Sequence, residues 1–400
     1  MTNISIKALT ILSAFILPFR LFSQPLSFDE TALKILKGSP LYVAEELGYE
    51  AATLSLKTET NLPDPQLEGE FLSTRADVTD RWSAQLSWDL DWPGIYNARK
   101  KNADALAKEA SMALTTGRNE RLGEIKKLLA DYILQEKKLK LMNDLSRTND
   151  SILLLSRSAA KDGEITLLDL NKIRLENASI HGMEATLADE RFATISALSA
   201  YYGVDCEGLL QSMICDFPAP YIPTDTEIEE FALNSPDVAG ADARLQAANA
   251  AAKVARMEMY PSLSVGYKYA YEDYMHFNGA TLGISLPIFS SRNKKKAADA
   301  LKSEADYNLH ATKDATILRM RQLSERLKNM KGQTDEISAI LNETDHSSLL
   351  LKAYKEGVIT LVDYLTERNY FTNAELDYLN LRHSITLTAI ELQNYIIYDS

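Results

Sequence analysis

The sequence predicts a mostly α-helical fold with a small β part, in which one structural unit occurs twice. Long stretches without proline carry apolar residues at spacings of three and four, as packed helices do. Four shorter stretches alternate apolar and polar residues, which is typical of strands with two unlike faces. Segments of both kinds recur in the same order at an offset of roughly 195 residues, which indicates a duplicated half-protein rather than a short repeat.

The duplication is clearest where one predicted helix turns into the next. The segment Lys161–Asp169, KDGEITLLD, matches Lys355–Asp363, KEGVITLVD. The segment Lys100–Leu106, KKNADAL, matches Lys295–Leu301, KKAADAL, at nearly the same offset. Matching pairs at one offset predict two long helical hairpins, one in each half of the chain.

Composition divides the chain into three regions. A basic residue followed by an uncharged apolar stretch is typical of a signal peptide, so we expect residues 1–23 to be removed on export, with Gln24 as the first mature residue. Three prolines within residues 216–223 stop a helix and separate the two halves. The mature chain then consists of a first repeat, 24–221, and a second repeat, 222–400.

Each repeat is expected to contain one short, one very long and one intermediate helix. A helix of about 60 residues is about 90 Å long, far beyond the length of helices in globular domains. Two shorter helices stacked end to end fit beside one such helix, so the repeats together predict a long helical tube. The expected helices span residues 28–60, 97–158, 165–201, 226–260, 290–354 and 361–398.

The alternating stretches form two predicted β-hairpins, 65–92 and 261–289. Residues 82–92 alternate strictly over about eleven positions, which is the length that a tilted strand needs to cross a bilayer. Trp and Tyr near strand ends are typical of the aromatic girdle at the lipid headgroups. We expect this lipid-facing girdle to comprise Trp82, Trp88, Trp92, Tyr267, Tyr269 and Tyr271.

Four strands are too few to close a barrel in one chain. Open sheet edges leave backbone amides unsatisfied in lipid, and barrels have at least about eight strands. Two copies would enclose a packed interior, whereas three would supply twelve strands around a water-filled lumen. The alternative is a periplasmic coiled-coil scaffold with a small half-buried sheet.

Several other classes of function are disfavoured. The formal net charge of −13 argues against nucleic acid as a partner. The sequence has no catalytic or nucleotide-binding fingerprint, and its five His residues share no metal-ligand spacing. We therefore expect no enzyme activity, no cofactor and no metal site. Cys206 and Cys215 could form a disulfide or stay unpaired, and their spacing does not decide between these.

Several motifs resemble those of TolC-like outer-membrane factors, a family of efflux proteins. A Gly-x-x-x-Leu-x-Asp motif occurs at the predicted turn of each half, in 163–169 and 357–363. The second half also carries YPSL at 260–263 and LPIF at 286–289. The segments NLPDP, 61–65, and DWPG, 91–94, are similar to the branch that serves heavy-metal exporters of the RND type. The resemblance covers residues 27 to 396.

The resemblance implies a homotrimer whose twelve strands form an outer-membrane β-barrel and whose helices form a periplasmic α-barrel. It implies a passive exit duct of a tripartite efflux system, coupled to a periplasmic adaptor (membrane fusion) protein and to an inner-membrane pump of the RND or ABC type. An alternative within the same family is the exit duct of a type I protein secretion system.

The resemblance also implies roles for residues at the hairpin turns. Asp363, Tyr354 and Asp169 are expected at the pore constriction, although the family's second acid is Thr366 here and its nearby Arg is Ile359. Threefold repetition would turn one carboxylate into a cation-attracting ring. The alternative is that both acids only stabilise helix N-termini. The expected adaptor contacts, all exposed, are Gly163, Ile165, Thr166, Leu167, Gly357, Ile359, Thr360 and Leu361.

Overall fold

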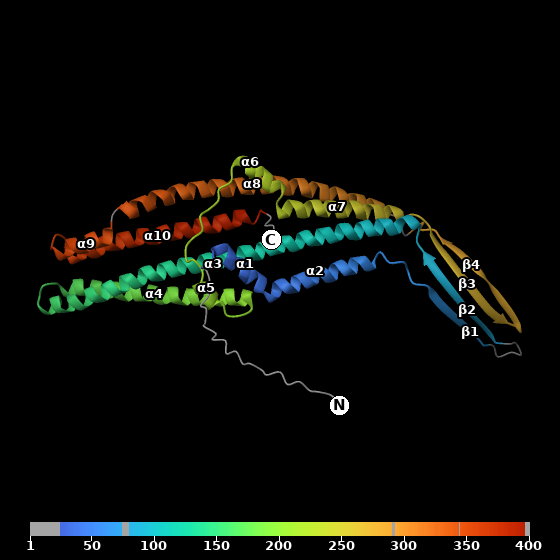
Figure 1. Cartoon of the computed structure of the whole chain (residues 1–400), viewed down its shortest axis with the longest axis horizontal. Coiled ribbons are helices and arrows are strands. Elements are labelled where there is room, and N and C mark those ends of the chain that lie inside the picture. Colours follow the sequence, from blue (N-terminus) through green and yellow to red (C-terminus); the bar gives the residue numbers. More distant parts are fainter. Residues whose placement is uncertain (1–24, 74–79, 290–292, 344, 397–400) are drawn as a thin grey trace, which may run out of the picture.

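A computed structural model describes residues 25–73, 80–289, 293–343 and 345–396. The expected signal peptide, residues 1–23, lies outside these ranges. Figure 1 shows an elongated molecule in which long helices run side by side and a sheet extends from one end. At the opposite end lie the two turns that join α3 to α4 and α9 to α10, and we call this end the helical tip.

The first half contains one helix that runs from the sheet to the tip. This helix, α3 (Pro93–Lys161), has 69 residues and is therefore about 100 Å long. The helix α4 (Leu167–Tyr202) returns along its distal part, and α2 (Pro40–Thr58) lies along its sheet-proximal part (Figure 1). The short helix α1 (Phe28–Gly38) precedes α2 and packs on α3 and α4, and the short helix α5 (Glu207–Gln211) follows α4 in the chain. Two shorter helices beside one long helix agree with the expected packing.

The second half has a similar order of elements. Helices α6 (Asp225–Leu233) and α7 (Pro236–Met257) pack against α8 (Lys294–Glu343). The chain then forms α9 (His346–Lys355), turns at the tip, and returns as α10 (Leu361–Gln393) beside α8 and α3. Within the described residues no helix is long and apolar enough to span a membrane.

Three of the expected helices, 28–60, 226–260 and 290–354, are each broken into two. The first two breaks precede a proline, where Ser39 and Ser235 have extended backbone with ψ of 121° and 151°. A residue before proline is pushed out of the helical region, and proline then starts the next helix at its first position. The third break is at Asp345, whose side chain accepts a hydrogen bond from the Ser348 amide at 3.1 Å and caps α9.

All four strands form one antiparallel sheet in the order β1-β2-β3-β4. Strand β2 (Arg81–Leu90) pairs with β3 (Ser262–Glu272) and so joins the two hairpins. Strands β1 (Gln66–Leu72) and β4 (Met275–Ser285) are the two edges. The turn between β3 and β4 consists of two residues with positive φ, a geometry that matches the twist of a hairpin.

The described residues of the helical part form three separate apolar cores. The first, in the middle of the molecule, contains the fully buried Ile125, Leu129 and Ile133 of α3 packed against α1, α4 and α10. The second joins α6 and α10 to α8, and the third lies at the helical tip. Cys206 is buried and Cys215 is exposed, and both are free thiols, so the possible disulfide is not formed.

Candidate functional site: the helical tip and the sheet

Glycine is needed in both turns at the helical tip. Gly163 and Gly357 have φ of 78° and 71°, a left-handed conformation that other residues adopt only with strain. A Cβ at either position would have no described atom within 4 Å, so the requirement comes from the backbone and not from crowding. Each glycine is followed by the threonine that caps the next helix, Thr166 for α4 and Thr360 for α10.

The two acids expected at the pore constriction bond to these caps. The Thr360 hydroxyl donates to the Asp363 carboxylate at 2.6 Å, and the Asp363 amide donates back to the Thr360 oxygen at 3.1 Å. Asp169 repeats this arrangement with Thr166, at 2.6 and 3.1 Å. The threonine hydrogen bonds hold the pKa of both carboxyls below the ordinary range. Both acids therefore stabilise helix N-termini, and their role at a pore stays a prediction.

Three residues expected to be exposed at the tip are instead half-buried. Ile165, Ile359 and Leu361 pack against the apolar core of the helical tip. The two isoleucines each precede a capping threonine, and at that position an apolar residue packs onto the first turn of its helix. Leu167 is 74% exposed as expected. The sequence reasoning missed further exposed apolar residues at the tip, namely Leu168, Val358 and Val362.

Tyr354 is half-buried and lies against Tyr364, with ring centroids 5.4 Å apart. Tyr364 also faces the guanidinium of Arg368, at 5.6 Å from the ring centroid. Tyr354 thus belongs to the tip core in this structure, and its expected part in a pore constriction is not tested by these contacts.

Arg368 is a buried charge that the sequence reasoning missed. It is 6% exposed, and its Nη2 donates to Glu176 of α4 and, at 3.1 Å, to Asn149 of α3. This one side chain therefore ties α10 to both helices of the first-half hairpin. A signal was present, because Leu365, Arg368, Thr372 and Leu379 follow the spacing of a coiled-coil seam.

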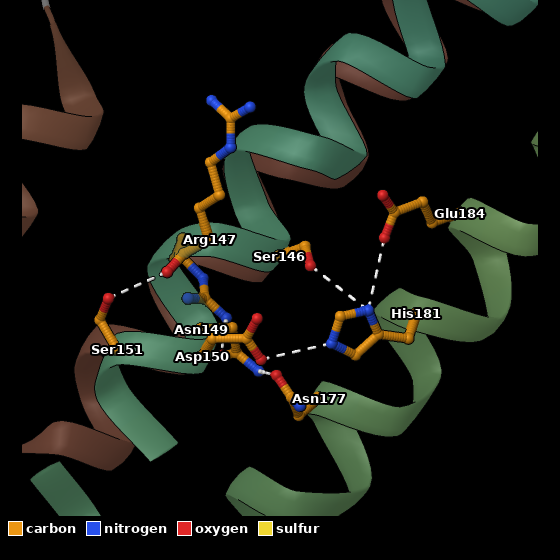
Figure 2. Close-up of polar contacts among 9 residues, drawn as sticks. Ser146, Arg147, Asn149, Asp150, Ser151, Asn177, His181 and Glu184 are labelled. Carbon is orange, nitrogen blue, oxygen red and sulfur yellow. Dashed lines mark hydrogen bonds and ion pairs between the residues drawn. The ribbon is translucent and has the colours of Figure 1, made fainter. Parts of the chain in front are cut away.

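A row of polar contacts also joins α3 to α4 next to this ion pair. Figure 2 shows His181 of α4 pointing toward α3, with Nε2 3.3 Å from the Asp150 carboxylate and Nδ1 3.4 Å from Ser146. Glu184 lies 3.4 Å from the same Nδ1. The hydrogen bond to Asp150 raises the pKa of His181. Within the described residues, no three His, Cys, Asp or Glu side chains are grouped as a metal site.

The sheet has one exposed apolar face. The residues Leu67, Leu86 and Tyr267, which lie opposite one another on β1, β2 and β3, are 78%, 51% and 53% exposed. On the other face of β2, Ser83 and Ser87 are buried. An exposed apolar face differs from the usual arrangement of a water-soluble sheet, in which the apolar face packs on the core.

Aromatic residues gather at both ends of this apolar face. At the end far from the helices, Trp82 lies 5.2 Å from Tyr269 and 6.4 Å from Tyr271 between ring centroids. At the end near the helices, Trp92 stacks on Tyr260 at 5.8 Å. The alternation predicts that Trp92 lies on the strand, and this is wrong. Strand β2 ends at Leu90, and Trp92 precedes the proline that starts α3.

Comparison with known proteins agrees with this architecture. Residues 228–396 match the family described as outer membrane efflux protein. The pyoverdine export outer membrane protein OpmQ of Pseudomonas putida is 22% identical over 377 residues, which cover 89% of this chain and 79% of that protein. The Campylobacter jejuni CmeC outer membrane channel has a similar structure, with a TM-score of 0.75 and 17% identity over 92% of this chain and 86% of that chain. The open state of the Neisseria gonorrhoeae MtrE outer membrane channel gives a TM-score of 0.74 and 16% identity over 92% and 88%.

These similarities confirm the resemblance to TolC-like outer-membrane factors and the mostly helical fold with a four-stranded sheet. They also confirm the predicted outer-membrane location. Because the matching family is described as outer membrane efflux protein, the prediction that the chain is not an enzyme is confirmed as well.

Proposed function

We propose that this chain, which resembles TolC-like outer-membrane efflux proteins, is the passive exit duct of a tripartite efflux system. In this proposal three copies assemble, with two repeated halves, 24–221 and 222–400, in each copy. A periplasmic adaptor protein and an inner-membrane pump, of the RND or ABC type, complete the system and supply the energy.

The observation that carries this proposal is the exposed apolar face of the sheet. Strand β2 (Arg81–Leu90) has ten residues and is about 33 Å long at a strand's rise per residue. Strands in membrane barrels tilt by about 45°, which reduces this span to roughly 25 Å, the height of the apolar band of such barrels. Aromatic residues lie at both ends of the span, where lipid headgroups would be.

Closure requires more than one copy, because β1 and β4 are the edges of the described sheet. Pairing β1 of one copy with β4 of the next would satisfy both edges, and three copies would close a barrel of twelve strands. The helices of the three copies would then continue the barrel as a tube of about 100 Å. At its far end, the exposed Leu167 and Val358 would contact the adaptor.

The name of the relative OpmQ, a pyoverdine export protein, favours a small-molecule cargo over the protein cargo of a type I secretion system. The scaffold alternative gives no reason for an apolar face that is exposed across all four strands. We therefore retain the efflux duct as the proposed function.

The test is to purify the full chain in detergent, determine its mass by sedimentation, and record conductance in planar bilayers. We expect a trimer that forms ion-conducting channels. Leu86→Lys should reduce membrane assembly strongly, because a Lys on a lipid-facing strand costs about 2–4 kcal/mol near the bilayer midplane. The matched control is Gln85→Lys on the opposite face of β2, which should assemble normally. A chain that is monomeric in water without detergent and conducts no ions would refute the proposal.

A further inference from the structure

Basic residues gather where the two long helices leave the sheet. In α3 they are Arg99, Lys100 and Lys101, and in α8 they are Lys294, Lys295 and Lys296. The two groups occupy equivalent positions in the two halves of a chain whose formal net charge is −13, and no acidic residue lies within 93–103 or 293–298. Both helices begin beside the sheet (Figure 1), so these residues form a basic band next to the ends of the strands.

The lysines of α8 do not stabilise their own helix. Lys294, Lys295 and Lys296 form its first turn, which contains no acidic residue. The N-terminus of a helix carries a partial positive charge, so cations at this position lower the stability of the helix. An anion bound beside the lysines would offset that loss.

The first basic residue of each group is paired on the polar side of the sheet. Arg99 pairs with Asp91 at 2.8 Å, and Lys294 pairs with Glu258 at 2.7 Å. Both cations line one cavity of about 260 Å³ together with Ser262 of β3. Ser262 belongs to the polar face, because the alternate positions of β3 carry the exposed apolar face.

The last basic residue of each group lies on the other side. Lys101 and Lys296 follow Arg99 and Lys294 by two residues, which is a rotation of about 200° around a helix. They therefore lie on the side that continues the apolar face of the sheet. Both are exposed, and neither makes an ion pair among the described residues. Side chains lean toward the N-terminus of their helix, so these two lean toward the sheet.

Apolar and aromatic residues lie between the strands and this band. Ile288 and Phe289, which connect β4 to α8, are 69% and 87% exposed. Trp92 and Tyr260, which stack on each other, occupy two other junctions of strand and helix. An apolar strand, an aromatic residue and then a lysine follow the order from the hydrocarbon of a bilayer to its headgroups, where the lysine stem covers apolar surface and the ammonium stays among polar groups.

We propose that Lys101 and Lys296 bind the phosphate groups of anionic phospholipids on the periplasmic side of the outer membrane. A lysine near an anionic membrane surface strengthens attachment by about fivefold, so two lysines act roughly 25-fold when they are not screened by salt. The inference rests on the proposed insertion of the sheet into the membrane, and it adds the class of lipid that the inserted chain retains.

The test uses the full chain in detergent and native mass spectrometry, which counts the lipids that stay bound. Phosphatidylglycerol, which is anionic, and phosphatidylcholine, which is zwitterionic, are added in equal amounts with the same acyl chains. The wild type should retain at least tenfold more phosphatidylglycerol, and this preference should fall when salt in the incubation screens the charges. An excess of inorganic phosphate should not displace the lipid, and complete displacement would mean a site for free phosphate and overturn the proposal.

The double variant Lys101→Gln, Lys296→Gln removes both charges and should lower the preference for phosphatidylglycerol by about tenfold. The matched control is Lys161→Gln, Lys355→Gln, which removes two exposed lysines that are also equivalent in the two halves but lie at the helical tip. It should keep the preference of the wild type. Lys101→Arg, Lys296→Arg retains the charges and should keep it too. Circular dichroism of all three variants checks that they fold.

Equal retention of the two lipids by the wild type, or equal preference of the Gln variant and the control, would overturn the proposal. A chain that retains both lipids equally and still conducts ions in bilayers contradicts the lysine site alone. A chain that retains neither lipid contradicts the proposed membrane insertion as well.

Discussion

Replacing Arg368 by Met should destabilise the helical tip, because the ion pair with Glu176 joins α10 to the hairpin of α3 and α4. The variant removes the Nη2 hydrogen bonds and leaves Glu176, which is 17% exposed, without its cation. Removing one partner of a buried pair destabilises proteins by about 3–5 kcal/mol. It also leaves the buried Asn149 oxygen without its donor from Arg368, which adds about 1–3 kcal/mol.

Two features of the structure reduce this sum. Glu176 keeps some contact with water. In the wild type, two guanidinium nitrogens also have no hydrogen-bond partner among the described residues, a penalty that Met does not carry. We therefore expect a net loss of about 3 kcal/mol for Arg368→Met. The double variant Arg368→Met, Glu176→Met contains neither charge. Because both ions are replaced by apolar side chains, it should regain about 2 kcal/mol of the stability that the single variant loses.

Hydrogen exchange of the α10 amides near the tip measures this loss locally. A loss of about 3 kcal/mol corresponds to roughly 100-fold faster exchange where exchange requires local opening. Arg326→Met, the same substitution at an exposed site on α8, serves as the control and should leave these amides unchanged. A stabilising role of the ion pair is refuted if the α10 amides of Arg368→Met exchange as slowly as in the wild type, or if the double variant is less stable than the single variant.

Three further predictions concern the turn, the carboxylate and the buried phenol. Gly357→Ala should strain the turn by about 1–2 kcal/mol and lower the yield of cross-linking to the adaptor. The control Gly182→Ala, in the middle of a helix, should do neither. A normal cross-linking yield for Gly357→Ala would contradict this prediction. Asp363→Ala should weaken the block of the channel by multivalent cations in bilayers. Thr360→Ala keeps the carboxylate of Asp363 and should therefore retain the block. Unchanged block in Asp363→Ala would rule out a role of Asp363 in the pore. Burial raises the pKa of Tyr132 from 10.0 to about 12, so the folded state keeps a neutral phenol while the unfolded chain ionises. Stability should therefore fall as the pH rises from about 10 to 12, and Tyr132→Phe should lack this part of the loss; identical pH profiles would disprove it.

Local patterns in the sequence predict most of the elements, but they do not predict where helices break. The apolar spacing of residues 226–260 continues across Pro236, because a proline at the first position of a helix is compatible with helical backbone. The serine before it has extended backbone, which interrupts the helix while leaving the spacing of side chains nearly in phase. The break at Asp345 has no proline or glycine at all and depends on one capping side chain.

Contacts between distant segments explain why the buried polar cluster was missed. Arg368 is 192 residues from Glu176 and 219 residues from Asn149 in the sequence. Its place in the apolar spacing of α10 indicates burial, but only the packing of α10 on α3 and α4 shows that the charge has a partner there. Within the part of the chain that the structure describes, the same packing leaves two guanidinium nitrogens of Arg368 without a hydrogen-bond partner. A charge in an otherwise apolar seam lowers stability unless it is fully paired, so the local pattern of α10 alone gives no reason to expect a partly paired arginine at this position.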